Sequence, residues 1–144
     1  MSMSDFVILT DSSADLGADL VQQLDVRVLP LSFTIQDHVY HNYPDNREME
    51  PHAFYEMLRA GEVATTSAVN VAQYTEALEP LLQEGRDVLV LAFSSGLSAT
   101  YSSSVIAVED LREKYPDRKL YTVDTLCASL GQGLLVYLAA QQRA

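Results

Sequence analysis

The chain of 144 residues has one cysteine, no tryptophan, and nine lysines and arginines against twenty aspartates and glutamates. A single cysteine, Cys127, excludes an internal disulfide, which agrees with a reducing cytoplasm. The net charge of −11, without a basic cluster, argues against nucleic acid and anionic membrane surfaces, because both require several grouped cations. We therefore expect a cytoplasmic protein that binds neither.

Long apolar runs are also missing. The longest, residues 88–93 and 134–140, fall well short of the roughly 20 residues that cross a bilayer. The N-terminus lacks the basic and apolar segments of a secretory signal. We expect no membrane span. A hydrophobic content of 48% is enough for one packed core, so residues 1–144 are interpreted as one domain.

Strand and helix patterns alternate along the chain. The strand-like segments are residues 6–9, 26–35, 87–93 and 120–123, and the segments with helical spacing are 16–24, 51–61, 71–85, 97–114 and 128–143. This alternation implies parallel pairing through right-handed crossovers, with helices on both faces. We predict an α/β fold, a three-layer α/β/α sandwich with a mainly parallel sheet of about four strands.

The polar segments between these elements carry the histidines and much of the hydroxyl content. Residues 36–47 are interpreted as an exposed excursion and residues 64–70 as a loop before a helix. His38, His41 and His52 lie in or just after the excursion, but no further ligands accompany them. We therefore interpret them as surface residues and expect no metal site.

Hydroxyl-rich turns follow three of the predicted strands, at residues 10–13, 94–96 and 124–125, and residues 65–67 provide a fourth. Ligands of parallel sheets bind beyond the carboxyl ends of the strands, where helix N-termini leave N–H groups unpaired. Hydroxyl and N–H groups together bind phosphate or carboxylate without lysine or arginine. Taken singly, each turn is better explained by helix capping, but their coincidence on one edge favours a site for a small anion.

Several common chemistries lack their motifs. The chain has no glycine-rich nucleotide loop, no serine elbow, and no histidine after His52 to complete a hydrolase triad. Asp11 lacks the second carboxylate, two residues on, that a phosphoaccepting aspartate would have. One enzymatic alternative stays open, a small enzyme that acts on a phosphate or carboxylate ligand with Asp11 as acid or base.

Residues 134–138 of the last predicted helix are apolar on nearly every side. A helix of this kind normally contacts protein on more than one face. We therefore expect a further domain, or a second copy of the chain, to cover it.

The ordered set of motifs resembles the DegV family of fatty-acid-binding proteins. The set comprises Thr10-Asp11-Ser12, Thr65-Thr66-Ser67, residues 94–101, Asp124-Thr125 and residues 131–134. The resemblance covers the whole chain but only the first half of the family. It implies that residues 1–144 are an N-terminal domain and that the family's second α/β domain is absent from this chain.

The resemblance also implies a ligand and a partner. Members of the family hold a long-chain fatty acid between two domains, and some present its carboxylate to the ATP-binding subunit of a bacterial fatty acid kinase. No catalytic residue, metal or cofactor is implied. The carboxylate contacts implied here are Thr65, Thr66, Ser67 and Ser95, supported by Asp11, Ser12, Ser94 and Gly96.

Overall fold

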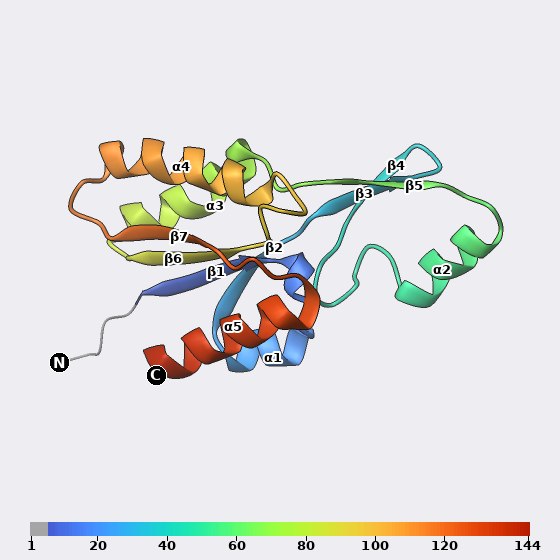
Figure 1. The fold of residues 1–144 in the computed structure, drawn as a ribbon, viewed down its shortest axis with the longest axis horizontal. Helices are drawn as coiled ribbons and strands as arrows, with labels where there is room; N and C mark the ends of the chain where they lie inside the picture. Colours follow the sequence, from blue (N-terminus) through green and yellow to red (C-terminus); the bar gives the residue numbers. More distant parts are fainter. Residues whose placement is uncertain (1–5) are drawn as a thin grey trace.

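The computed structural model describes residues 6–144 and contains a central sheet of four strands. Its order is β2-β1-β6-β7, and every neighbouring pair runs parallel (Figure 1). The strands are β1 (Val7–Asp11), β2 (Val26–Leu29), β6 (Val88–Ala92) and β7 (Leu120–Asp124). The predicted parallel sheet is confirmed.

Helices cover both faces of this sheet (Figure 1). One face carries α3 (Val71–Gln83) and α4 (Thr100–Lys114), and the other carries α1 (Ala18–Gln23) and α5 (Ser129–Arg143). A larger hydrophobic cluster lies between the sheet and α3 and α4, and a smaller one lies on the side of α1 and α5. The three-layer α/β/α prediction is therefore confirmed.

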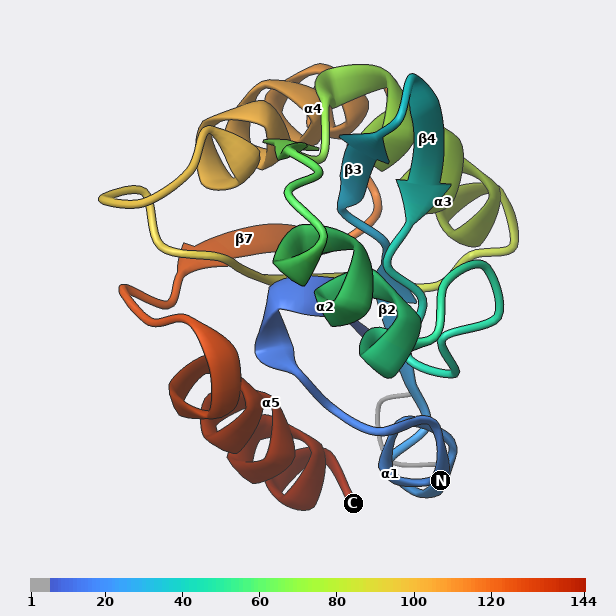
Figure 2. The ribbon, with the colours of Figure 1, turned by 90° about the vertical axis from the view of Figure 1, so that its right-hand side faces the viewer.

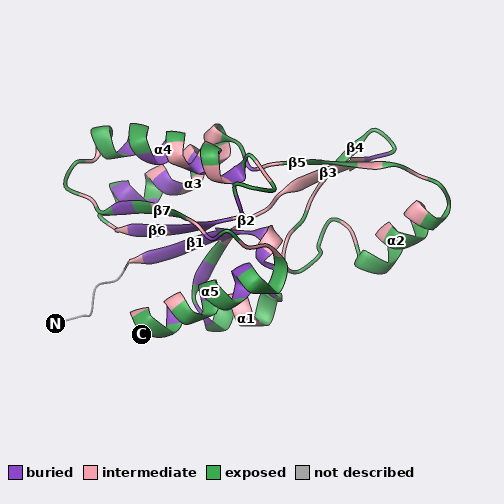
Figure 3. Ribbon diagram, viewed as in Figure 1, coloured by how far each residue is buried: buried purple, intermediate pink, exposed green. Residues whose placement is uncertain are grey.

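The two central strands are buried on both faces. Leu9 of β1 and Val90 of β6 belong to the larger cluster, whereas Ile8 and Leu91 belong to the smaller one. Because successive side chains of a strand point to opposite faces, a strand covered on both sides needs an almost continuous apolar run. Figure 3 shows the buried residues concentrated in this sheet and in the helix faces that meet it.

A second, three-stranded sheet projects beyond the carboxyl ends of the parallel strands (Figure 1). It is antiparallel, with the order β4-β3-β5. Its strands are β3 (Ser32–Ile35), β4 (His38–His41) and β5 (Ala64–Ser67), and α2 (Pro51–Arg59) lies in the connection between β4 and β5. This projection is more exposed than the central sheet (Figure 3).

The expected single strand at residues 26–35 is wrong, because it is two strands in two different sheets. β2 ends at Leu29 and β3 begins at Ser32, so Pro30 and Leu31 form the link between the sheets. Proline has no N–H to give to a ladder, which makes it a natural point at which pairing stops.

The expected loops at residues 36–47 and 64–70 are also wrong in part, since they contain β4 and β5. The β3–β4 turn lacks the glycine that usually marks a hairpin, because Gln36 and Asp37 adopt the left-handed φ values of 51° and 61° themselves. β5 consists of Ala-Thr-Thr-Ser and is mostly exposed, so it shows no apolar alternation.

Candidate functional site

The carboxyl ends of β1, β6 and β7 lie side by side, because these three strands are neighbours in the sheet (Figure 2). Asp11 ends β1, Ser94 follows shortly after β6, and Asp124 ends β7. The second sheet, which contains Thr66, projects from the same end of the molecule (Figure 1). The hydroxyl-bearing turns identified in the sequence are expected at this end of the parallel sheet.

Asp11 is fully buried, and its carboxylate joins η1 (Ser12–Ala14), α5 and the segment after β6 through hydrogen bonds. Its Oδ1 accepts hydrogen bonds from the Ser13 N–H (3.1 Å), the Ser13 hydroxyl (2.6 Å) and the Gln132 amide (3.2 Å). Its Oδ2 accepts from the Phe93 N–H at 2.8 Å. Both carboxylate oxygens therefore accept hydrogen bonds from other residues of the chain, which favours a structural role for Asp11 over that of an acid or base.

The short 3₁₀ helix η1 (Ser12–Ala14) presents two hydroxyls with different hydrogen-bonding states. The Ser12 Oγ accepts from the Leu31 N–H at 2.9 Å, and within residues 6–144 its own proton has no acceptor. The Ser13 Oγ lies between two acceptors, Oδ1 of Asp11 at 2.6 Å and Oε1 of Gln132 at 2.5 Å. A hydroxyl has one proton, so Ser12 can donate to an anion whereas the proton of Ser13 is already committed.

The turn after β6 is held by its own hydrogen bonds and by β7. The Gly96 N–H donates to Oγ of Ser94 at 3.2 Å, and the Ser95 N–H donates to Oδ1 of Asp124 at 3.1 Å. Hydrogen bonds from the Ser95 side chain and from the N–H groups of Leu126 and Ser95 hold the pKa of Asp124 below its ordinary value. Ser95 itself is exposed at this turn.

Thr66 lies in the middle of β5, opposite Phe33 of β3. Side chains alternate along a strand, so Thr66 faces one side of the second sheet while Thr65 and Ser67 face the other. The three neighbouring hydroxyls implied by the resemblance therefore do not all point the same way.

A groove of about 400 Å³ lies between η1, the second sheet and α2. Its polar lining includes the residues Ser12, Ser13 and Thr66, and its apolar lining includes Phe33 and Phe54. The two phenylalanines meet edge to face, with ring centroids 5.1 Å apart. The remaining lining residues are Asp15, Leu31, Ser32, Asn42, Asn46, Met49, Pro51 and Tyr55. No lysine, arginine or histidine belongs to this lining, so hydroxyl and amide groups supply its hydrogen-bond donors.

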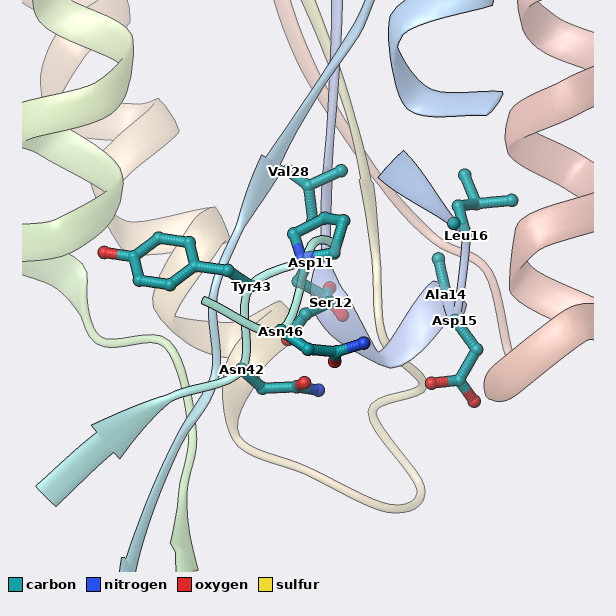
Figure 4. Close-up of a pocket in the computed structure, with 11 residues that line it drawn as sticks. Asp11, Ser12, Ala14, Asp15, Leu16, Val28, Asn42, Tyr43 and Asn46 are labelled. Carbon is teal, nitrogen blue, oxygen red and sulfur yellow. The ribbon is translucent and has the colours of Figure 1, made fainter. Parts of the chain in front are cut away.

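A smaller hollow of about 190 Å³ adjoins the groove and shares Ser12, Asp15, Asn42 and Asn46 with it. Figure 4 shows Asn42 and Asn46 beside Ser12, on the far side of the hollow from Leu16. The hollow extends the polar end of the groove toward β2, whose Val28 forms part of the wall.

The structure thus brings together some of the residues expected at the site. Ser12 and Thr66 line one groove, together with Ser13, which the sequence-based set did not include. Ser95 is not part of the lining, so joint contact of Thr66 and Ser95 with one carboxylate stays a prediction. The apolar wall was also missed, because Phe33 and Phe54 meet only once β3 and α2 have folded against one another.

Neither a metal cluster nor a membrane-spanning helix is found within residues 6–144. No group of three or more histidine, cysteine, aspartate or glutamate side chains is gathered there as a metal site would require. In the same range, no helix combines the length and apolar character needed to cross a membrane.

A family model described as "Uncharacterised protein, DegV family" matches residues 5–144, nearly the whole chain. The chain belongs to the DegV family. A DegV domain-containing protein of Clostridium perfringens is 50% identical over 141 residues, which are 98% of this chain and 48% of that protein. A DegV domain-containing protein of Streptococcus pyogenes is 36% identical to this chain, over 96% of this chain and 48% of that protein. The chain therefore spans about half the length of these DegV proteins.

Solved DegV structures share the fold described above. A structure titled as showing fatty acid binding of a DegV family protein from Thermus thermophilus matches with a TM-score of 0.82 and 32% identity. It is matched over 94% of this chain and 46% of its own. The structure of DegV from Bacillus subtilis, titled a fatty acid binding protein, matches with a TM-score of 0.79 and 27% identity over 97% of this chain and 47% of its own.

Proposed function

We propose that this DegV chain binds the acid end of a long-chain fatty acid in the groove between η1, the second sheet and α2. The observation that carries the proposal is the lining of that groove, with hydroxyls from η1 and β5 and aromatic side chains from β3 and α2. The DegV proteins of Thermus thermophilus and Bacillus subtilis, both described by their structures as binding fatty acids, support the same ligand class.

The apolar wall would supply most of the affinity. Each buried methylene of an acyl chain contributes about 0.8 kcal/mol, before the cost of ordering the ligand. Phe33, Phe54 and Met49 offer such a surface, and the volume of about 400 Å³ lies within the range of small-ligand sites. The tail therefore sets how tightly the ligand binds, and the head-group contacts set which end enters.

The polar end would select the carboxylate through neutral donors. Ser12 has a proton to give, and Thr66 brings a second hydroxyl to the same groove. A hydrogen bond to a charged acceptor contributes about 1.5 to 3 kcal/mol, which corresponds to roughly a tenfold or greater change in affinity. Ser95, from the turn after β6, is proposed as a further contact.

Displacement of a fluorescent fatty acid by oleic acid tests this assignment. We expect Ser12→Ala and Thr66→Val each to weaken oleic acid binding about tenfold, because each removes one donor to a charged acceptor. Thr65→Val is the matched comparison on the same strand, and its effect should be smaller because its side chain faces the opposite side. Equal losses for the two threonine variants would contradict the groove as the site, and a wild-type protein without affinity for oleic acid would refute the function.

A second part of the proposal concerns α5. Leu130, Leu134 and Leu138 recur every four residues on this helix and are each about half exposed or more. Since the relatives are about twice as long as this chain, we propose that their remaining half packs against this face. Presentation of the bound carboxylate to the ATP-binding subunit of a fatty acid kinase is part of the same proposal, and it rests on the family resemblance alone.

A further inference from the structure

Gln132 is fully buried on α5 and reaches the end of β1. Its Nε2 donates to Oγ1 of Thr10 at 3.0 Å and to Oδ1 of Asp11 at 3.2 Å. Its Oε1 accepts from the Ser13 hydroxyl at 2.5 Å. The Gln132 side chain thus forms hydrogen bonds with three residues close to Ser12 in sequence. Such pairing offsets the free-energy cost of burying a side-chain amide.

The backbone of α5 also approaches η1 closely. A Cβ placed on Gly133 would lie 2.7 Å from the carbonyl oxygen of Ala14, the last residue of η1. The Ser129 hydroxyl donates to Oδ2 of Asp15 at 2.6 Å, one residue further along. The first turns of α5 therefore form the surface against which η1 is held, and Gln132 is the fully buried part of that contact.

The network decides which hydroxyl of η1 is available to a ligand. Asp11 and Gln132 both lie within hydrogen-bond distance of the Ser13 hydroxyl and share its one proton. Ser12, which lies between Asp11 and Ser13 in sequence, keeps its own proton. If Gln132 were removed, Oδ1 of Asp11 would lose a donor and Ser13 would lose an acceptor. The turn would then be held only by the bonds of Asp11 to Ser13 and Phe93 and by the bond of Ser12 to Leu31, so the direction of the Ser12 hydroxyl would be less closely fixed.

We propose that Gln132 is a positioning residue for the head-group end of the groove, an inference that rests on the fatty acid function proposed above. Gln132 does not line the groove. It acts through Asp11 and Ser13, which hold the turn so that Ser12 donates toward the ligand carboxylate. Supporting groups of this kind determine how accurately a binding group is held, and hence how well it discriminates.

The test compares oleic acid with oleyl alcohol, which has the same tail and no carboxylate. For each variant the affinity ratio of acid to alcohol is measured by displacement of a fluorescent fatty acid, and folding is checked by circular dichroism. We expect Gln132→Leu to lower the ratio about tenfold, the equivalent of one hydrogen bond to a charged acceptor, while alcohol affinity changes little. Gln141→Leu, an exposed glutamine on the same helix, is the matched control and should leave the ratio unchanged.

Ser13→Ala tests the same network should Gln132→Leu fail to fold, because it removes the shared hydroxyl and leaves Gln132 in place. It should lower the ratio in the same direction, and the double variant should lose no more than the larger single effect, since both act on one unit. Additive losses, or an acid preference that survives both single variants, would overturn the role of Gln132. A wild-type protein that binds acid and alcohol equally would instead refute the proposed head-group site.

Discussion

Tyr74 carries the one buried side-chain polar atom that lacks a hydrogen-bond partner among the residues described. It is fully buried in the cluster beneath α3 and α4, and burial, with a smaller effect of Asp11, raises the pKa of its hydroxyl. An unpaired buried hydroxyl costs about 1 to 3 kcal/mol. We expect Tyr74→Phe to raise the free energy of unfolding by about 1 kcal/mol, measured by urea denaturation.

Tyr115→Phe is the comparison for that experiment. The Tyr115 hydroxyl donates to Glu79 at 2.9 Å and accepts from Gln83 at 3.1 Å, so removing it should lower the free energy of unfolding by about 1 kcal/mol. A decrease for Tyr74→Phe as well would mean that the Tyr74 hydroxyl has a partner in solution, such as a buried water.

Asp124 makes stability depend on pH in a definite direction. Hydrogen bonds from Ser95 and Leu126 lower its pKa in the folded state below the ordinary 3.8. Its contribution is therefore complete above the unfolded-state pKa and is lost as the pH falls through the lowered folded-state pKa. We expect Asp124→Asn to destabilise the protein at pH 7 and to make progressively less difference below about pH 4. Urea denaturation at several pH values measures this, with Asp110→Asn on the exposed side of α4 as the control.

At the scale of elements, the sequence predicts the central sheet well because burial on both faces leaves an unmistakable pattern. Residues 87–93 are almost wholly apolar, and β6 occupies Val88–Ala92 within them. The same reasoning fails for the second sheet, where exposure removes the need for apolar side chains. The left-handed φ of Gln36 and Asp37 at the β3–β4 turn is set by tertiary context, so no glycine marks the turn.

The packing of α5 on η1 gives a prediction of opposite sign for two glycines of one helix. Replacing glycine by alanine in a helix normally stabilises it by about 0.5 to 1 kcal/mol. Gly131→Ala should follow this rule, because its new Cβ meets nothing closer than 3.6 Å. Gly133→Ala should instead lower the free energy of unfolding by about 1 to 3 kcal/mol, since its Cβ would lie 2.7 Å from the Ala14 carbonyl oxygen.

Thermal or urea denaturation of the two alanine variants measures the difference. Equal stabilisation in both would show that α5 can move away from η1 at little cost. That result would also weaken the case that Gln132 is held in a fixed position, because Gln132 and Gly133 belong to the same contact.

At the scale of the whole molecule, the candidate site joins parts that lie far apart in the chain. Thr66 is placed by its register with Phe33, and Ser12 is tied to Leu31 at the start of that same projection. The sequence indicates the hydroxyls themselves, since each stands in a recognisable turn or motif. It gives no sign that α2 folds over them with Phe54, because that contact depends on the path of the two connections that join α2 to β4 and β5 of the second sheet.

The exposed face of α5 leads to a prediction about the association of the whole chain. Leu134 has 58% of its surface exposed, and full burial of a leucine contributes about 1.5 to 3 kcal/mol. The 144-residue chain is therefore expected to associate through this face as its concentration rises, and sedimentation velocity measures the change.

Leu134→Asp should weaken this association at least tenfold, because an unpaired charge would be buried at the contact, while circular dichroism shows that the fold is kept. Val39→Asp is the matched control, since Val39 is 61% exposed on β4, away from α5. A wild-type chain that sediments as a monomer at every concentration would contradict self-association. If both substitutions weakened self-association equally, the contact would lie outside α5. The cause would then be the added negative charge on a chain whose net charge is already −11.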